Sequence, residues 1–458
     1  MNRQIRFALI SSIAPLLTGC PLSDDYYVDS NSQAGAMGGQ SSGGNGTAGT
    51  STSSTCGAAN CSNVCCGNIC SDLTSDPSNC GACATACPGG QACVSGHCAS
   101  GWAAIAAPPA SFVPREKAAY VVMGDRVFIF GGADTNDTSL NDGAIYNPKT
   151  NRWTLISTDS NTPSPRRLST AVWTGTSVLV FGGRIDAITA GYQDAAVYNP
   201  SADHWLSEPS NSNGRVGSIG VSSALLTAFW GGWGAYSAVI AGTERFDWSS
   251  SAWSSATSSA YVEPGVLDNT AWAFTGQYLY LYGGRVNSTT KTNAAYSYDL
   301  LNNAWTSLGG TTLAAPSARW GAFGVWDGSA FFVWAGRDDS SAKSDGAKFG
   351  SGAWKTTSAT GAPAARWAPA RQTGWAYAAG PGDLLFIGGQ DALGNYFNDG
   401  GRYVEASGSS TGSWTPIPRW PSGENHQWGV AAYVGGTLIV WGGHNGTVAT
   451  ATGERWAP

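Results

Sequence analysis

The stretch Val127-Phe128-Ile129-Phe130-Gly131-Gly132 contains the pattern that decides the fold: four apolar residues run into a glycine pair. Counted from the first residue of each pair, six further copies follow at intervals of 49 to 54 residues. Their pairs are Gly182-Gly183, Gly231-Gly232, Gly283-Gly284, Ala335-Gly336, Gly388-Gly389 and Gly442-Gly443. A repeat of this length indicates stacked units that bury their apolar faces against their neighbours.

An aromatic residue and then a tryptophan follow the first six pairs. Four of these couples share one spacing: Tyr146 and Trp153, Tyr198 and Trp205, Phe246 and Trp253, Tyr298 and Trp305. A shorter and a longer version are Phe349 with Trp354 and Tyr403 with Trp414. This order of apolar strand, Gly-Gly, variable loop, Tyr and Trp resembles the kelch repeat over residues 101–458. The resemblance implies an all-β fold, a seven-bladed β-propeller with four antiparallel strands in each blade.

The physical properties of these residues suit such a blade. An apolar run without alternation is typical of a strand covered on both faces. The glycines after it allow a sharp turn and close approach of another backbone. We expect the Tyr and Trp side chains to fill the wedge between adjacent blades, as part of the core.

The two ends of the repeat region predict how the ring closes. The seventh repeat stops at Trp456 and therefore lacks an outer strand with its tryptophan. Trp102 stands 29 residues before Gly131, the same distance that separates Trp153 from Gly182. We expect Trp102 to lie on the missing outer strand, so that closure leaves no free sheet edge.

The start of the chain is typical of an exported protein. Arg3 and Arg6 precede an apolar run over residues 7–17, which is too short for an ordinary membrane-spanning helix. The Leu-Thr-Gly that ends at Cys20 resembles the lipobox of bacterial lipoproteins. This implies a signal peptide over residues 1–19, an acylated Cys20, and attachment to the outer membrane, facing the periplasm or the cell surface. An ordinary cleaved signal is the alternative.

Two segments of unusual composition separate this start from the repeats. Residues 20–55 form the lipidated N-terminus and a linker rich in Gly, Ser and Thr, which cannot bury enough apolar surface to fold and is expected to be a flexible tether. Residues 56–98 contain ten cysteines, for which an oxidising compartment predicts five disulfides of open connectivity. They are Cys56, Cys61, Cys65, Cys66, Cys70, Cys80, Cys83, Cys87, Cys93 and Cys98.

Zinc is the alternative for this cysteine-rich module, because Cys80, Cys83 and Cys87 lie near His97. The run that begins at Asp76 resembles a small module of surface lipoproteins in some Gram-negative bacteria, a resemblance that implies no activity. We interpret the module as a rigid spacer, with adhesion as an alternative. We expect no metal and no cofactor.

Two sets of equivalent positions are candidate binding residues, because a propeller gathers equivalent loops around one central mouth. The residues directly after the glycine pairs are Ala133, Arg184, Trp233, Arg285, Arg337, Gln390 and His444. About fifteen residues before each pair, after a recurrent Pro-x-Arg or Pro-Arg, stand Glu116, Arg167, Val216, Asp268, Trp320, Gln372 and Gln427. In the sixth repeat Trp367 competes with Gln372, since Arg366 and Arg371 both fit the motif. Resemblance to animal kelch proteins that capture acidic peptides implies that both positions line one face.

The chemistry of these positions favours an anionic or aromatic-stacking ligand. Arg167, Arg184, Arg285 and Arg337 concentrate positive charge, and their forked side chains suit carboxylate or sulfate groups. The indole rings of Trp233 and Trp320 could stack on a sugar or hold a peptide side chain. Gln390, His444, Glu116 and Gln427 complete the candidate set. The structural alternative is that the arginines pair with carboxylates and carbonyls of the fold.

Composition and motifs limit the other functions. The net charge is -6, which offers no basic footprint for nucleic acid. No cysteine follows Cys98, so the Tyr–Cys crosslink of galactose oxidase, a kelch-propeller enzyme, cannot form. Glu116, Asp268 and His444 could converge as acid–base groups, as in any mouth lined by polar side chains.

We therefore predict a monomeric propeller in a surface-anchored protein that binds a protein or glycan ligand. An extracellular carbohydrate-active hydrolase, isomerase or lyase that uses the same mouth is one alternative. A passive structural lipoprotein of the cell envelope is another. Fold does not decide among these, because one propeller architecture hosts many functions.

Overall fold

The computed structural model describes residues 64–457 with internal gaps. The gaps are 67–68, 75, 77, 88–91, 95, 100, 187–189, 212, 235–238, 256–263, 265–268, 287–289, 310–313, 369–373 and 406–411. The predicted signal peptide, the acylated Cys20 and the tether lie outside the described residues, as do Cys56, Cys61, Asp268 and Gln372. Among the described residues no helix has the length and apolar character needed to span a bilayer.

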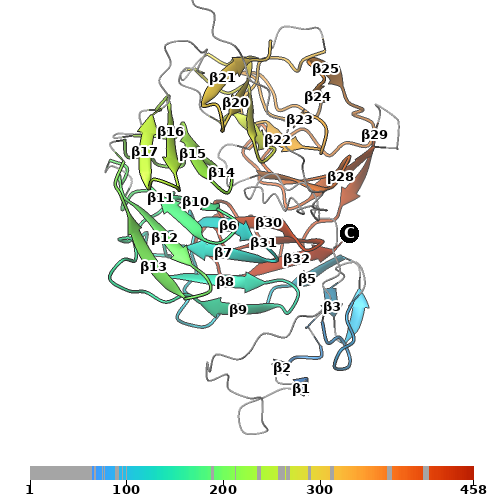
Figure 1. Cartoon of the computed structure of the whole chain (residues 1–458). Coiled ribbons are helices and arrows are strands. Elements are labelled where there is room, and N and C mark those ends of the chain that lie inside the picture. The colour runs from blue at the N-terminus through green and yellow to red at the C-terminus, as the bar shows by residue number, and fades with distance from the viewer. Residues whose placement is uncertain are drawn as a thin grey trace, which may run out of the picture.

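Seven four-stranded antiparallel sheets form the blades of a propeller, which confirms the predicted all-β, seven-bladed fold (Figure 1). Blade 1 contains β6 (Ala119–Met123), β7 (Arg126–Phe130), β8 (Gly143–Asn147) and β9 (Arg152–Leu155). Blade 2 contains β10 (Thr170–Trp173), β11 (Val178–Phe181), β12 (Ala195–Asn199) and β13 (His204–Glu208). Blade 3 contains β14 (Ile219–Ser222), β15 (Leu226–Trp230), β16 (Thr243–Asp247) and β17 (Ala252–Ser255).

The remaining four blades follow the same order of strands. Blade 4 contains β18 (Ala271–Phe274), β19 (Tyr278–Tyr282), β20 (Ala295–Asp299) and β21 (Ala304–Ser307). Blade 5 contains β22 (Phe323–Trp326), β23 (Phe331–Trp334), β24 (Gly346–Gly350) and β25 (Ala353–Thr356). Blade 6 contains β26 (Gly374–Gly380), β27 (Asp383–Gly388), β28 (Gly400–Glu405) and β29 (Gly412–Ile417). Blade 7 contains β30 (Val430–Val434), β31 (Thr437–Trp441), β32 (Gly453–Ala457) and β5 (Gly101–Ala104).

Blade 7 confirms the predicted closure. Its fourth strand, β5, comes from the N-terminal side and pairs with β32, with Trp102 directly opposite Trp456. The Trp102 Nε1 donates to the carbonyl oxygen of Pro418 at 2.7 Å, and the Trp102 ring meets the Trp420 ring edge-on at 5.6 Å. The first and last residues of the propeller are therefore joined in one sheet.

The aromatic couples pack as the repeat predicts. In blade 2, for example, Tyr198 lies directly opposite Trp205 across β12 and β13. The Trp205 ring also lies 4.9 Å from the ring of Phe130, the last residue before the glycine pair of blade 1. Because each such tryptophan reaches into the preceding blade, the wedge between blades is filled by aromatic side chains.

The glycine pairs are required by close contact between blades. Gly131 has a φ of 67°, and a Cβ there would lie 2.5 Å from the carbonyl oxygen of Arg166 in the next blade. The amide of Gly132 donates to that same carbonyl at 2.9 Å. In the fifth repeat Ala335 replaces the first glycine, but the second is kept, because Gly336 has a φ of 91° and a Cβ there would lie 2.9 Å from the Cβ of Ala322.

The cysteine-rich module contributes two small hairpins, β1 (Val64–Cys66) with β2 (Ile69–Ser71) and β3 (Ala92–Val94) with β4 (His97–Ala99). Disulfides join Cys66 to Cys83, Cys80 to Cys93 and Cys87 to Cys98. Cys65 and Cys70 are also disulfide-bonded. Cys80, Cys83 and Cys87 each lie in one of these disulfides, which favours the disulfide interpretation. The sulfur atoms of Cys80, Cys87 and Cys98 also lie within 4.8 Å of one another, so zinc stays the alternative.

Candidate functional site

The two predicted sets of positions are paired residue by residue at one end of the propeller, where the first strand of each blade begins and the second ends. We call this end the mouth. The pairs are Glu116 with Ala133, Arg167 with Arg184, Val216 with Trp233, Trp320 with Arg337, Trp367 with Gln390 and Gln427 with His444. The choice left open in the sixth repeat is thereby resolved in favour of Trp367.

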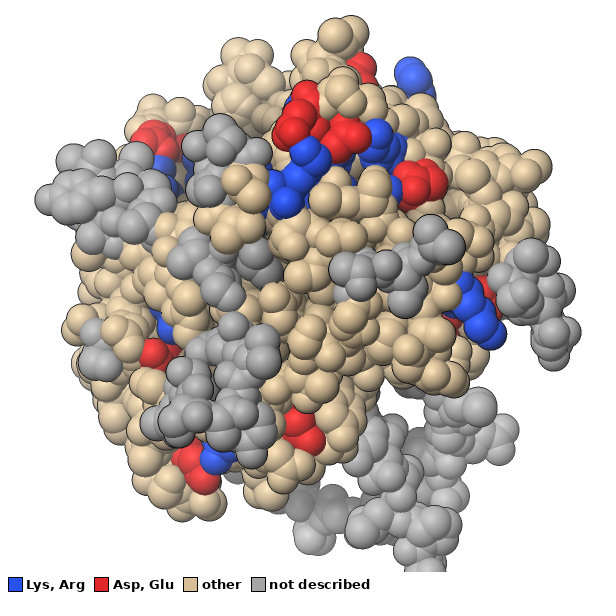
Figure 2. Space-filling view, turned by 90° about the horizontal axis from the view of Figure 1, so that it is seen from above, with Lys and Arg blue, Asp and Glu red and all other residues tan. Residues whose placement is uncertain are grey.

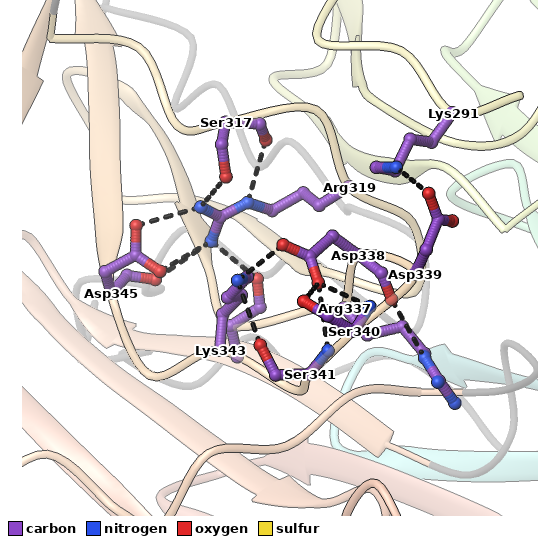
Figure 3. Close-up of polar contacts among 11 residues, drawn as sticks. Lys291, Ser317, Arg319, Arg337, Asp338, Asp339, Ser340, Ser341, Lys343 and Asp345 are labelled. Carbon is purple, nitrogen blue, oxygen red and sulfur yellow. Dashed lines mark hydrogen bonds and ion pairs between the residues drawn. The ribbon is translucent and has the colours of Figure 1, made fainter.

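A buried basic side chain precedes the paired residue in six blades and fixes its place. In blade 5 the Arg319 Nη1 donates to the carbonyl oxygen of Ala335 at 3.0 Å and to Asp345 Oδ1 at 2.9 Å. Its Nη2 donates to Asp345 Oδ2 at 2.8 Å (Figure 3). Burial raises the pKa of Asp345, but the hydrogen bonds and charge of Arg319 outweigh it and hold that pKa below its ordinary value.

The same arrangement recurs around the ring, with one exchange of residue type. The buried anchors are Arg115, Arg166, Arg215, Arg319, Arg366 and His426. In blade 7, His426 takes the place of arginine: its Nδ1 lies 2.7 Å from the carbonyl oxygen of Gly442 and its Nε2 lies 3.0 Å from Glu454 Oε2. The Pro-x-Arg motif was recognised in the sequence only as a marker of position. The role of its arginine as a buried anchor was not predicted.

A series of backbone hydrogen bonds links blades 7, 1, 2 and 3 just after the anchors. The amide of Lys117 donates to the carbonyl of Trp428, that of Leu168 to Lys117 and that of Gly217 to Leu168, each at 2.8 Å. Lys117, Leu168 and Trp428 have φ values of 57°, 56° and 58°, a conformation that most side chains avoid. The same backbone conformation therefore recurs just after the anchors of blades 7, 1 and 2.

Arginine and tryptophan side chains from blades 4, 5 and 6 form a contiguous stack at the mouth, which we call the Arg–Trp ladder. The guanidinium of Arg285 lies 4.2 Å from the ring centre of Trp320. The rings of Trp320 and Trp367 meet edge to face at 4.4 Å. The guanidinium of Arg337 lies 5.5 Å from the Trp320 ring and 4.8 Å from the Trp367 ring. The sequence predicted three of these residues but not their contact.

The loops between the second and third strands are here called the lip loops. Asp or Asn side chains accept hydrogen bonds from backbone amides within several of these loops. In blade 5, Asp338 accepts from the amides of Ser340 and Ser341 at 2.9 Å and pairs with Lys343 (Figure 3). Lys291 of blade 4 forms an ion pair with Asp339 of blade 5. Asp134, Asp391 and Asn445 cap the lip loops of three further blades in the same way.

Two of the predicted binding residues are engaged by the fold. Arg167 is 4% exposed; it forms an ion pair with Asp137, and its Nε donates to Ser139 Oγ at 2.9 Å. Glu116 forms an ion pair with Lys117. For Arg167 this geometry favours the structural alternative. Arg184 remains half-buried beside it, and burial followed by the charge of Arg167 lowers the pKa of Arg184.

Trp233, His444 and Gln427 lie at the mouth with part of their surface accessible, whereas Gln390 is buried. Trp233 is half-buried, with its ring packed against Gly217, where a Cβ would lie 2.9 Å from the ring. His444 and Gln427 are half-buried opposite each other. Asp268, the third member of the possible acid–base group, lies outside the described residues, so the proposed convergence with Glu116 and His444 stays a prediction.

The first strands of three neighbouring blades line a small cavity. It has a volume of about 40 Å³ and lies between blades 4, 5 and 6, lined among others by Thr270, Trp272, Gly321 and Phe323. Pockets for small molecules usually measure a few hundred Å³ or more. The mouth therefore offers a surface for contact rather than a deep chamber at this position.

The molecular surface carries few charges. In Figure 2 most of the visible surface is uncharged, and Lys or Arg side chains lie beside Asp or Glu side chains in local clusters. Around the mouth, Ile185, Val286, Leu393 and Val448 of the lip loops are 44%, 42%, 87% and 44% exposed. These are single side chains on four different blades, and single exposed aliphatic side chains are ordinary on a protein surface.

The fold, the repeat and the mouth define a kelch-type β-propeller. A family model described as Attractin/LZTR1 beta-propeller matches residues 127–366, just over half of the chain. The chain belongs to this family.

Two curated relatives have enzyme names. The chain is 29% identical over 170 residues to the N-acetylneuraminate epimerase of Yersinia enterocolitica. The matched segment covers 28% of this chain and 41% of that protein. It is 31% identical over 94 residues to the N-(sulfonatooxy)prop-2-enimidothioate sulfolyase of Thlaspi arvense, 20% of this chain and 26% of that protein. The chain thus spans less than half the length of these relatives. The solved structure of YjhT aligns at a TM-score of 0.49 with 17% identity, over 68% of this chain and 99% of that one.

Proposed function

We propose that the protein binds an anionic ligand carried by another protein or a glycan, with the Arg–Trp ladder as the centre of the site. The single observation that supports this most is the ladder itself, in which Arg285, Trp320, Arg337 and Trp367 stack across three blades. A guanidinium over an indole is oriented before the ligand arrives, and its hydrogen-bond donors suit a carboxylate or sulfate.

The surroundings of the ladder support a large partner. The ladder extends over three blades, and the cavity of about 40 Å³ between the same blades is too small to enclose a sugar. The chain as a whole has a net charge of -6, so local positive charge at the mouth would direct an acidic group to this place. Anchoring through Cys20 would display the site in the cell envelope.

The test is binding of the purified protein to acidic-peptide and glycan arrays, followed by titration of the best ligand. We expect the double variant Arg285→Gln, Arg337→Gln to bind at least tenfold more weakly, since each lost charge-assisted bond contributes about 1 kcal/mol or more. The matched control, Arg126→Gln with Arg152→Gln, removes the same charge from β7 and β9. Equal weakening by both variants, or by neither, would contradict the site.

An isomerase or lyase acting on an extracellular carbohydrate is the second candidate. The names of the two relatives favour it, as does the pairing of Gln427 with His444 beside Glu116 on the side of the mouth formed by blades 7 and 1. Nuclear magnetic resonance of N-acetylneuraminate anomers mixed with the protein tests it directly. Turnover that disappears in Glu116→Gln would establish an enzyme and overturn a function limited to binding.

A further inference from the structure

The cysteine-rich module lies against the place where the propeller closes. Its strand β3 contacts both β5 and β32 of blade 7, and the module sits beside β5 in Figure 1. Ser78 Oγ of the module also donates to the carbonyl oxygen of Lys149 at 3.0 Å. Lys149 belongs to the turn between β8 and β9, so the module bridges blade 7 and blade 1.

A buried arginine of blade 7 and a buried aspartate of the module lie on the two sides of the same interface. Arg455 on β32 is 1% exposed, and its Nη1 donates to the carbonyl oxygen of Pro148 at 3.2 Å. Asp76 of the module, itself 2% exposed, interacts electrostatically with Arg455. A buried guanidinium without a counter-charge would be strongly destabilising, so the module supplies part of what makes Arg455 tolerable in blade 7.

The strand under the module is the one that needs support. In blades 1 to 5 the fourth strand continues from the third through a short turn, and in blade 6 it is the next strand in the chain, whereas β5 joins β32 with no such covalent link. Four residues, Gly101 to Ala104, hold the closure by their pairing with β32 and by the Trp102 side chain. A strand end of this kind opens more readily than a hairpin.

We propose that the cysteine-rich module is a clamp that holds β5 in blade 7 and so keeps the propeller closed. The disulfides give the module a fixed shape, Ser78 bonds the turn of blade 1, Asp76 attracts the charge of Arg455, and β3 lies against β5. The clamp acts at the end of β5 that begins with Gly101, opposite Ala457, whereas Ala104 at the other end leads toward the mouth. The described part of the module therefore does not cover the mouth. A force that acts on the N-terminal chain reaches the module before it reaches β5.

Reduction of the module is a selective test, because every cysteine of the sequence precedes residue 101. A phosphine reductant takes oxygen from water to become the phosphine oxide, and each disulfide gains two electrons and two protons to give two thiols. Hydrogen exchange followed by mass spectrometry then compares β5 with β9, the hairpin-linked outer strand of blade 1. We expect exchange in residues 101–104 to accelerate at least tenfold on reduction, and exchange in residues 152–155 to stay unchanged.

A pair of variants tests the charge contact without reductant. We expect Asp76→Asn to accelerate exchange in β5, and the control Asp72→Asn, which alters a carboxylate that caps Thr74 inside the module, to do so at least threefold less. Exchange in β5 that does not respond to reduction, after alkylation has proved the thiols free, would overturn the clamp. Equal acceleration in β5 and β9 would overturn it too, because it would show general loosening. Neither result depends on what the mouth binds.

Discussion

Arg319 shows how a single buried side chain positions the mouth. Its guanidinium bonds the Ala335 carbonyl and both oxygens of Asp345, and the next residue in the chain is Trp320 of the ladder. The partners lie 16 and 26 residues away in sequence, beyond a loop of variable length. The motif was visible in the sequence, but its bonding pattern depends on where the third strand returns.

Replacing Arg319 by Leu should therefore destabilise the propeller and disorder the ladder. The carbonyl of Ala335 would remain buried without its donor, which costs about 2 kcal/mol or more. Urea unfolding monitored by far-ultraviolet circular dichroism measures this change. The exposed Arg126→Leu should fall within about 0.5 kcal/mol of the original protein. Equal stability of the two variants would show that the buried anchor does not carry this role.

Substitutions of Trp320 separate the contribution of ring stacking to ligand binding from the contribution of the arginine charges. We expect Trp320→Ala to weaken binding of the array-selected ligand about tenfold, because Arg285 and Arg337 lose the ring that orients them. Trp320→Phe keeps a ring face and should lose at most about threefold. Titration calorimetry at one salt concentration compares the three proteins. Identical affinities in all three would mean that the ring is only part of the core.

At the scale of the element, β5 was predicted from one spacing in the sequence. Trp102 and Trp153 stand at the same distance from the following glycine pair, and the structure places Trp102 opposite Trp456 as that spacing requires. The spacing is informative because a blade needs its outer strand to bury an aromatic couple. The contact of the module with β5 had no comparable signal, because it joins two parts that do not share a repeat.

Deletion of residues 101–114 should lower the melting temperature far more than deletion of the linker residues 21–55. Loss of the packing of one tryptophan costs about 3–5 kcal/mol, which corresponds to a fall of roughly 5 °C for a domain of this size. Differential scanning calorimetry measures both deletions. An unchanged melting temperature without residues 101–114 would refute the closure.

The His426–Glu454 pair makes blade 7 sensitive to acid. Burial raises the pKa of Glu454, but hydrogen bonds from His426 and Ser422 outweigh it and hold that pKa below the ordinary value of 4.5. A carboxyl group of this kind stabilises the fold above its ordinary pKa, and the stabilisation is lost as pH falls through the lower pKa of the folded state. We expect the free energy of unfolding to fall below about pH 4.5, less steeply in Glu454→Gln.

Urea titrations between pH 3 and pH 6 measure this difference in slope. His426→Arg is the informative partner variant, because it restores the pairing that Arg319 makes in blade 5 and should fold normally. Parallel pH profiles for the original protein and Glu454→Gln would contradict the role of the carboxylate.

At the scale of the whole molecule, the sequence was sufficient for the architecture and for the position of the mouth. Seven repeats spaced 49 to 54 residues apart leave little freedom in the fold, because six have a full glycine pair and six have an aromatic couple. The chemistry of the mouth was less accessible, because it depends on which side chains of neighbouring blades touch. Arg167 forms an ion pair with Asp137, whereas Arg337 stacks on two tryptophans, and the sequence did not show which partners either side chain would meet.

The most direct test of the account is the structure of the protein in complex with a ligand selected on the arrays. We expect the anionic group of the ligand to lie within hydrogen-bonding distance of Arg285 or Arg337, with an adjacent group against the face of Trp320. A ligand bound at the opposite end of the propeller, or along the outer strands, would contradict it.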